Sequence, residues 1–141
     1  MIIAVDFDGT MHDGKYPKIG NPVSGCISNM KKIHDDGHYI IIWTCREGSE
    51  QEKMIEWLKK KKIPYDRVND NHPNRIKEYK SNSRKVHADM YIDNKNILGI
   101  PTWDKIYNSI SNQSNGKSHA LLAILPIVLA NSKKNIDSDE E

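Results

Sequence analysis

Two aspartates close to the amino terminus are the first residues whose types and spacing suggest chemistry. Asp6 and Asp8 end an apolar run, IIAV, and only Phe7 separates them. Side chains two residues apart on a strand project to the same side, so these carboxylates would repel each other unless a cation lay between them or one of them kept its proton. Such a pair is typical of sites that bind a metal ion or transfer protons.

Two further polar residues follow other apolar runs. Thr44 ends the run 38–44, and Asp93 ends the run 89–93. In an open parallel sheet the ligand lies beyond the carboxyl ends of the strands, and all of these residues fall at such ends. We therefore expect Asp6, Thr44 and Asp93, together with the second aspartate of the first run, to converge on one crevice.

The elements that would position these residues alternate along the chain. Strand-like runs occupy 2–7, 38–44, 89–93 and, more weakly, 65–68, and helical patterns fall at 23–34, 49–62, 74–80 and around 103–110. Gly37 is expected to end the first helix, and Ser49 with Glu52 predicts a capping box at the start of the second. Uniformly apolar strands separated by helices predict an α/β fold with a doubly wound parallel sheet.

The same residues resemble the four motifs of the haloacid dehalogenase (HAD) superfamily of phosphatases. The resemblance rests on DFDGT at 6–10, Thr44 after an apolar strand, Lys85, and DMYIDN at 89–94, in that order. It extends from residue 2 to about residue 110. The run 83–101 is similar to that of small members without a cap domain, so the resemblance implies a Rossmann-like core with an open, capless site.

By this resemblance the protein is a phosphatase that works through an aspartyl-phosphate. Asp6 is the nucleophile. Asp8 is the general acid, with a pKa raised above the ordinary value of about 4. A Mg²⁺ ion is held by the carboxylates of Asp6 and Asp93 and by the main-chain carbonyl of Asp8, an all-oxygen set that suits this ion.

The resemblance also implies which side chains neutralise the phosphate. Thr44 donates its hydroxyl to a phosphoryl oxygen. Lys85 neutralises the phosphate and holds Asp6. The resemblance favours this lysine because it lies four residues before Asp89 and eight before Asp93, and its nearby competitors for the role are Lys77, Lys80 and Arg84.

Main-chain amides are expected to contribute to the same site. Gly9 and Thr10 bring the first loop close to the phosphate, and the amides of Cys45 and Arg46 lie at the entry to the 49–62 helix. The side chains of Arg46 and His12 lie near the expected crevice. Contact with the substrate stays open for both, and exposed loop side chains are the favoured interpretation.

Two residues of the last motif depart from the strongest expectation. Asn94 stands where many relatives carry a second acid, and it adds no negative charge although it can orient a metal-bound water. We therefore expect a lower affinity for the metal ion. Asp89 belongs at the start of its strand, remote from Asp93, and is interpreted as a structural residue.

Length and composition fit one domain, with a core at 1–112 and a tail at 113–141. The formal charge of +2 does not indicate nucleic-acid binding by itself, and two cysteines without close spacing favour a reducing cytoplasm. The apolar run 120–130 is too short to cross a bilayer, which takes about 20 residues. Packing against the domain or a partner, disorder and a membrane-surface contact stay open for this run.

The substrate is expected to be a phosphomonoester of a kind that an open site can accept. A phosphorylated protein, a nucleic-acid end or a nucleotide fits, or a second subunit of a homo-oligomer supplies a lid. Two other classes are weighed: a receiver-like phosphoacceptor, which would carry its aspartate on a middle strand of the chain, and a catalytically weak or inactive HAD-fold binding protein, to which Asn94 points.

Overall fold

The computed structural model describes residues 1–116. The chain separates into two units, Met1–Tyr107 and one that begins at Asn108, and each is considered by itself. In the second unit, residues 108–116 are helical. The apolar run 120–130 lies outside the described residues, and the predicted boundary at residue 112 stays a prediction.

A four-stranded parallel sheet forms the centre of the first unit. It consists of β1 (Ile2–Val5), β2 (Tyr39–Ile42), β3 (Arg67–Val68) and β4 (Met90–Ile92), in the order β3-β2-β1-β4. All three pairings are parallel. The side chains of β1 are all buried, and so are those of β2 after its first residue. The predicted α/β fold with a parallel sheet is confirmed.

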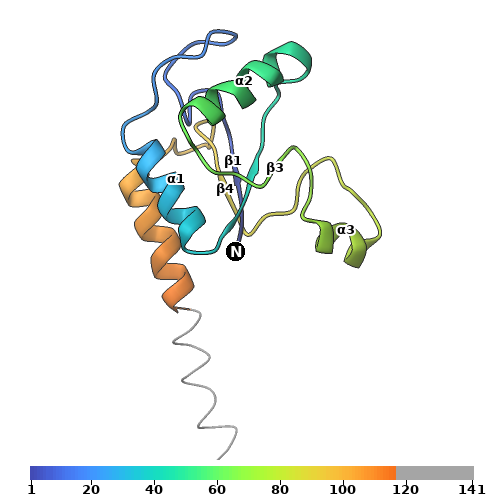
Figure 1. Ribbon diagram of the computed structural model, residues 1–141. Helices are drawn as coiled ribbons and strands as arrows, with labels where there is room; N and C mark the ends of the chain where they lie inside the picture. Colours follow the sequence, from blue (N-terminus) through green and yellow to red (C-terminus); the bar gives the residue numbers. More distant parts are fainter. Residues whose placement is uncertain (117–141) are drawn as a thin grey trace, which may run out of the picture. The chain divides into compact units, whose positions relative to one another are not determined.

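Helices connect successive strands. α1 (Cys26–Asp35) follows β1, α2 (Gly48–Lys60) follows β2, and α3 (Pro73–Tyr79) follows β3. A further helix begins at residue 103. Figure 1 shows how the strands and the helices α1, α2 and α3 of the first unit are arranged.

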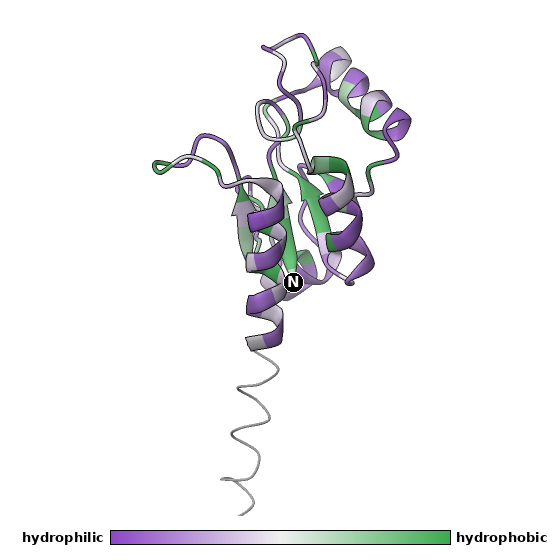
Figure 2. Cartoon of the chain, turned by 90° about the vertical axis from the view of Figure 1, so that its left-hand side faces the viewer, coloured by the Kyte–Doolittle hydropathy of each residue, from purple (hydrophilic) through white to green (hydrophobic). Residues whose placement is uncertain are grey.

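The start of this last helix is fixed to α1 by side chains. Asn29 Nδ2 donates to Asp104 Oδ1 at 2.8 Å, and Tyr107 Oη donates to Asp36 Oδ2 at 2.8 Å. Figure 2 shows hydrophobic strands at the centre and mostly hydrophilic outer surfaces on the helices. This distribution is expected when each helix buries one stripe against a sheet.

The helix ends confirm one prediction and correct another. Gly37 follows α1 with φ +89°, a left-handed conformation that suits glycine at a helix end. The predicted capping box is wrong: α2 begins one residue earlier, its N-cap is Glu47, and that residue makes no side-chain capping bond. Ser49 therefore lies inside the first turn, where it cannot cap. Across residues 1–116, we find no helix with both the length and the apolar character needed to span a membrane.

Candidate functional site

The carboxyl ends of β1, β2 and β4 lie at the same edge of the sheet, with β1 between the other two. The strand ladder continues one residue beyond β1, because the Asp6 N–H donates to the Ile92 carbonyl at 2.8 Å. Asp6 and Asp93, which follows Ile92, therefore leave neighbouring strands at the same level. The segment that carries Thr44 begins beside them at the end of β2.

Asp6 is held by neutral donors. Thr10 Oγ1 donates to Asp6 Oδ2 at 2.8 Å, and among residues 1–116 no cationic side chain forms an ion pair with this carboxylate. Burial raises the pKa of Asp6 to about 6; hydrogen bonds from Thr10 and the Phe7 amide offset part of the rise, and the charges of Asp93 and Asp8 add to it. Burial and the neighbouring acids therefore make ionisation of Asp6 costlier than in water, and a nearby cation would offset this cost.

Asn94 lies directly against Asp6. Its Nδ2 donates to Asp6 Oδ2 (3.0 Å), to the Asp8 carbonyl oxygen (3.2 Å) and to Thr10 Oγ1 (3.3 Å), whereas the opposite amide orientation would turn its oxygen toward acceptors only. Gly9 has φ +79°, and a Cβ at this position would clash with the Asn94 amide. Glycine is thus required here both for its left-handed backbone and for the close approach of Asn94.

Thr10 organises this half of the site rather than offering its amide to a ligand. Its side chain is buried, and its Oγ1 accepts the Asn94 N–H at 3.0 Å while donating to Asp6. Its main-chain N–H donates to the Phe7 carbonyl at 3.3 Å, and its own carbonyl accepts the Trp103 Nε1–H at 3.0 Å. Thr10 therefore positions the two polar side chains that face it.

Asp8 lies in the opposite environment. Arg46 donates to both of its oxygens, from Nη2 to Oδ1 at 2.7 Å and from Nε to Oδ2 at 2.9 Å. His12 Nε2 donates to Oδ1 at 2.9 Å. Partial burial acts against ionisation, but the hydrogen bonds from Arg46 and His12 and the positive charge of Arg46 outweigh it and lower the pKa of Asp8 below its ordinary value. The predicted rise in the pKa of Asp8 is therefore wrong.

Arg46 is a buried residue, and its interpretation as an exposed loop side chain is wrong. Only 1% of its surface is exposed. Besides the Asp8 carboxylate, its guanidinium meets Glu50 Oε2 at 3.4 Å and the Pro17 carbonyl at 3.0 Å. It also lies over the rings of Phe7 and Tyr16, 5.3 and 5.0 Å from their centroids. A buried guanidinium needs such a complete set of partners because desolvation of a charge is costly.

His12 is also fully buried, which corrects its interpretation as an exposed residue. Its Nδ1 accepts the main-chain N–H groups of Gly14 and Gly20 at 3.0 and 3.1 Å. An acceptor nitrogen carries no proton, so the hydrogen bond to Asp8 is donated by Nε2–H of the neutral ring. His12 thereby ties the Asp8 carboxylate to the loop that follows it.

Thr44 lies at this edge with its hydroxyl proton available. Its Oγ1 accepts the Arg46 N–H at 3.1 Å, so the Arg46 amide is already engaged, while the O–H can still donate. Asn69, which follows β3, forms two hydrogen bonds with the Thr44 main chain. Its Oδ1 accepts the Thr44 N–H at 2.8 Å, and its Nδ2 donates to the Thr44 carbonyl at 2.7 Å. Cys45, which lies between Thr44 and Arg46 in the sequence, has an exposed, free thiol. The role of Asn69 was missed, although a polar residue just after the 65–68 run could have suggested it.

Lys85 is the predicted site residue that the structure does not bring into contact with the carboxylates. Its side chain is exposed, and its Nζ lies over the Tyr91 ring, 5.1 Å from the centroid. Asn71 fixes the surrounding segment by donating to the Ser83 carbonyl at 3.0 Å and accepting the His87 N–H at 2.7 Å. Within residues 1–116 no ion pair of Lys85 is found.

The two acids of the last motif lie at opposite ends of β4. The Asp93 carboxylate raises the pKa of Asp6 through its charge, and its Oδ1 accepts the Lys95 N–H at 2.9 Å. Asp89 Oδ2 accepts the Ile2 N–H at 2.7 Å, a structural contact between strand starts. In the described part of the chain no group of three or more His, Cys, Asp or Glu side chains could hold a metal ion, so a site there needs other oxygens as well.

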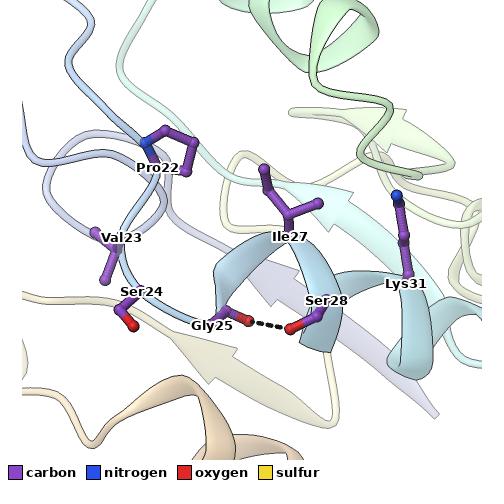
Figure 3. A pocket seen from close by; sticks show the side chains of 7 residues that line it. All are labelled: Pro22, Val23, Ser24, Gly25, Ile27, Ser28 and Lys31. Atoms are coloured by element: carbon purple, nitrogen blue, oxygen red, sulfur yellow. Dashed lines mark hydrogen bonds between the residues drawn. The ribbon is translucent and has the colours of Figure 1, made fainter.

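Two hollows lie next to each other near the start of α1, and one of them reaches the loop that carries the acids. One, of about 310 Å³, is lined by Gly9 and Thr10 and by the segments around Val23–Gly25 and Ile100–Asp104. The other, of about 480 Å³, lies at the start of α1, where the Ser28 hydroxyl donates to the Gly25 carbonyl at 3.3 Å (Figure 3). Both hollows include Val23, Ser24 and Gly25, so an open surface leads from the acidic loop along α1.

These observations define an α/β parallel-sheet protein with an acidic cluster at the carboxyl ends of its strands. No protein-family model matches the chain, and no curated protein matches it. Among solved structures, the chain is similar to a conserved protein coded by a locus from Bacteroides thetaiotaomicron, with 36% identity and a TM-score of 0.73 over 80% of this chain and 91% of that one. The chain belongs to the family of that conserved protein.

Proposed function

We propose that the protein is a Mg²⁺-dependent phosphomonoester hydrolase of the HAD superfamily, with Asp6 as its nucleophile. The carrying observation is the contrast between its two neighbouring carboxylates. Asp8 is bound by Arg46 and His12, whereas Asp6 faces neutral donors and other acids at the carboxyl end of the central strand. Arg46 engages both oxygens of Asp8, which leaves Asp6 as the carboxylate of the pair that can attack a phosphorus.

The oxygens around Asp6 fit the magnesium ion that the HAD resemblance implies. Asp6 Oδ2 and the Asp8 carbonyl oxygen both lie within hydrogen-bond distance of the Asn94 side-chain nitrogen, at 3.0 and 3.2 Å, so the two oxygens lie close together. Together with the Asp93 carboxylate they form an all-oxygen donor set, which suits a hard divalent ion. When bound, such an ion would neutralise the acids and the phosphate oxygens.

The chain's own residues can then carry two displacement steps. In the first, Asp6 Oδ1 attacks the phosphorus, the bond from phosphorus to the leaving oxygen breaks, and an aspartyl-phosphate forms. In the second, water attacks that phosphorus, and the Asp6 carboxylate is regenerated as inorganic phosphate leaves. Thr44 supports both steps by donating its free O–H to a phosphoryl oxygen.

Asp8 is better prepared for the second step than for the first. The donors on its carboxylate favour the ionised form, and this form accepts a proton from the attacking water. Donation to the leaving oxygen requires the protonated form, which Arg46 and His12 oppose. The proposal therefore predicts a preference for phosphomonoesters whose leaving groups need little protonation.

The remaining features of the proposal concern the surroundings of the site. The proposal includes a doubly wound core, which is supported by the strand order, because β4 lies on the other side of β1 from β2 and β3. It also includes a site without a cap, which large phosphorylated substrates could enter. Cytoplasmic location and a homo-oligomer that closes the site stay predictions. A binding protein without turnover is the second candidate, and the observation that favours it is the exposed Lys85, which lies over Tyr91 instead of beside Asp6. A receiver-like phosphoacceptor is less well supported, because the aspartates follow the first strand of the chain.

A phosphatase panel tests the proposal. Full-length protein would be incubated with sugar phosphates, nucleotides, phosphorylated oligonucleotides, phosphopeptides and p-nitrophenyl phosphate, with Mg²⁺ or with EDTA. We expect Mg²⁺-dependent release of phosphate, fastest from p-nitrophenyl phosphate. No release from any compound, by folded protein shown to bind Mg²⁺, would favour the binding-protein alternative.

A further inference from the structure

The loop formed by residues 13–21 is a closed unit at the rim of the acidic cluster. The Asp13 N–H donates to the Asn21 carbonyl at 3.0 Å, and the Asn21 N–H donates to Asp13 Oδ1 at 2.8 Å. Gly14 and Gly20 approach so closely at the neck that a Cβ on either would clash with the main chain of the other. Both glycines also donate to the same buried imidazole nitrogen. The loop is therefore held in one shape.

The inner side of this loop is anchored to the residue that holds Asp8. Arg46 Nη2 donates to the Pro17 carbonyl at 3.0 Å while it also binds Asp8. The Tyr16 ring lies 5.0 Å from the same guanidinium, in cation–π contact. Figure 1 shows the loop in blue beyond the carboxyl ends of the strands, close to α2. The Arg46 side chain thus lies between Tyr16 and the Asp8 carboxylate.

The outer side of the loop offers an aromatic ring and two cations to solvent. Tyr16 is 58% exposed although its ring lies against Arg46. Lys15 and Lys18 flank it, are exposed, and form no ion pair within residues 1–116. The charge of Arg46 is already matched by Asp8 and by Glu50, so the two lysines are the cations that this rim offers to an anionic ligand.

We propose that the loop binds the phosphorylated end of a single-stranded nucleic acid. Tyr16 stacks on a base near the terminal phosphate, and Lys15 and Lys18 contact backbone phosphates, a combination that single-strand-binding surfaces use. This inference rests on the proposed function, because a terminal phosphate has to reach Asp6 only if Asp6 hydrolyses it. The open, capless rim leaves room for the rest of the strand.

Binding can be measured separately from turnover. Full-length protein in EDTA would be titrated into a fluorescent oligonucleotide of about eight nucleotides, phosphorylated at its 3′ or 5′ end, and followed by anisotropy. Tyr16→Ala should weaken binding about 5- to 100-fold, the loss typical of one stacked base. Tyr16→Phe should bind like the wild type, and Tyr16→Leu like the alanine variant.

The matched control is Tyr79→Ala. Tyr79 is 59% exposed, almost the same as Tyr16, but it ends α3 and lies 6.2 Å from the His87 ring, not at the acidic cluster. Its substitution should leave oligonucleotide affinity unchanged. Replacing Lys15 and Lys18 together by alanine should lower the slope of log K against log salt by about 1.4, the value for two single-strand phosphate contacts.

The outcomes separate this inference from the proposed function. If the wild type hydrolyses p-nitrophenyl phosphate but binds no oligonucleotide, or if a phosphopeptide binds with the same dependence on Tyr16, the inference is overturned and the proposed function stands. Equal affinities for Tyr16→Ala, Tyr16→Leu and Tyr79→Ala would also overturn it. Oligonucleotide binding that depends on Tyr16, without turnover of any phosphate, would support binding by the loop and contradict the proposed function.

Discussion

Asp6 and Asp8 are identical in chemistry and two residues apart, yet the protein surrounds them in opposite ways. Asp6 faces Thr10 and Asn94, and burial raises its pKa to about 6. Asp8 is bound by Arg46 and by a neutral histidine, and its pKa is lowered. The comparison teaches that the spacing of two acids in the sequence is not enough to assign their roles. Their roles depend on the residues that surround each carboxylate in the fold.

The largest effect should come from removing Asp6, the proposed nucleophile. Asp6→Asn should reduce phosphate release by a factor on the order of 10² or more, because an amide cannot form the aspartyl-phosphate. Asp35→Asn, which makes the same charge change at an exposed position of α1, should keep the wild-type rate. Rates on p-nitrophenyl phosphate check this, and a turnover of Asp6→Asn close to the control would remove Asp6 from the nucleophile role.

Removing Arg46, the main partner of Asp8, should lower the free energy of unfolding. Arg46→Ala leaves Asp8 without its main partner and empties a fully buried position, so we expect a loss of about 3 kcal/mol in the free energy of unfolding. Arg75→Ala breaks a solvent-exposed pair with Glu78 and should lower the free energy of unfolding much less, because water screens exposed ion pairs. Urea denaturation measures both, and equal losses would mean that the Asp8–Arg46 pair is no more important than a surface pair.

The two carboxylates should also give opposite pH dependence of stability in metal-free protein. The raised pKa of Asp6 favours folding below its ordinary value of 3.8, and this contribution is lost as the pH rises to about 6. Asp6→Asn should therefore be more stable than the wild type at pH 8, by roughly 1 to 2 kcal/mol after allowance for partial exposure. This advantage should vanish at low pH.

The lowered pKa of Asp8 acts in the other direction. It stabilises the fold above the ordinary value of 3.8, and the contribution is lost as the pH falls through the depressed pKa. Asp8→Asn should therefore be less stable than the wild type at neutral pH and approach it in acid. Thermal melts in EDTA from acidic to neutral pH measure both variants, and curves that shift in the same direction would contradict the comparison.

The smallest predicted effect concerns Asn94, which faces the Asp6 side. Asn94→Asp places a further negative charge beside Asp6 Oδ2 and the Asp8 carbonyl. It should tighten Mg²⁺ binding several-fold, a gain on the order of 1 kcal/mol. Isothermal titration calorimetry with Mg²⁺ checks this. If the titration matches that of the wild type, residue 94 does not face a metal site.

The elements that the sequence predicts well are those with a strong local pattern. The runs IIAV and YIII became the buried strands β1 and β2, and Gly37 ends α1 as expected. Weak patterns gave weak elements, since β3 is only Arg67–Val68 and α3 buries no residue. Local signals thus determine where strands and long helices lie.

The acids of the candidate site could be predicted from the sequence, but the residues that bind them could not. Arg46 lies 38 residues from Asp8 along the chain, and its polar neighbours in sequence suggest an exposed loop. Only the fold brings the two together, which is why the direction of the Asp8 pKa was predicted wrongly. His12 was predicted to be near the crevice, but its burial was not predicted, because that burial depends on Gly14 and Gly20 folding back over it.

The most direct test of the central claim is to locate the phosphorylated residue. Wild-type protein would be mixed with p-nitrophenyl phosphate and Mg²⁺, quenched in acid and treated with borohydride, which reduces an aspartyl-phosphate to homoserine. Mass spectrometry of the amino-terminal peptide should find homoserine at position 6 and unmodified aspartate at position 8. Homoserine at position 8 or 93, or turnover without any reduced aspartate, would contradict the assignment of Asp6 as the nucleophile.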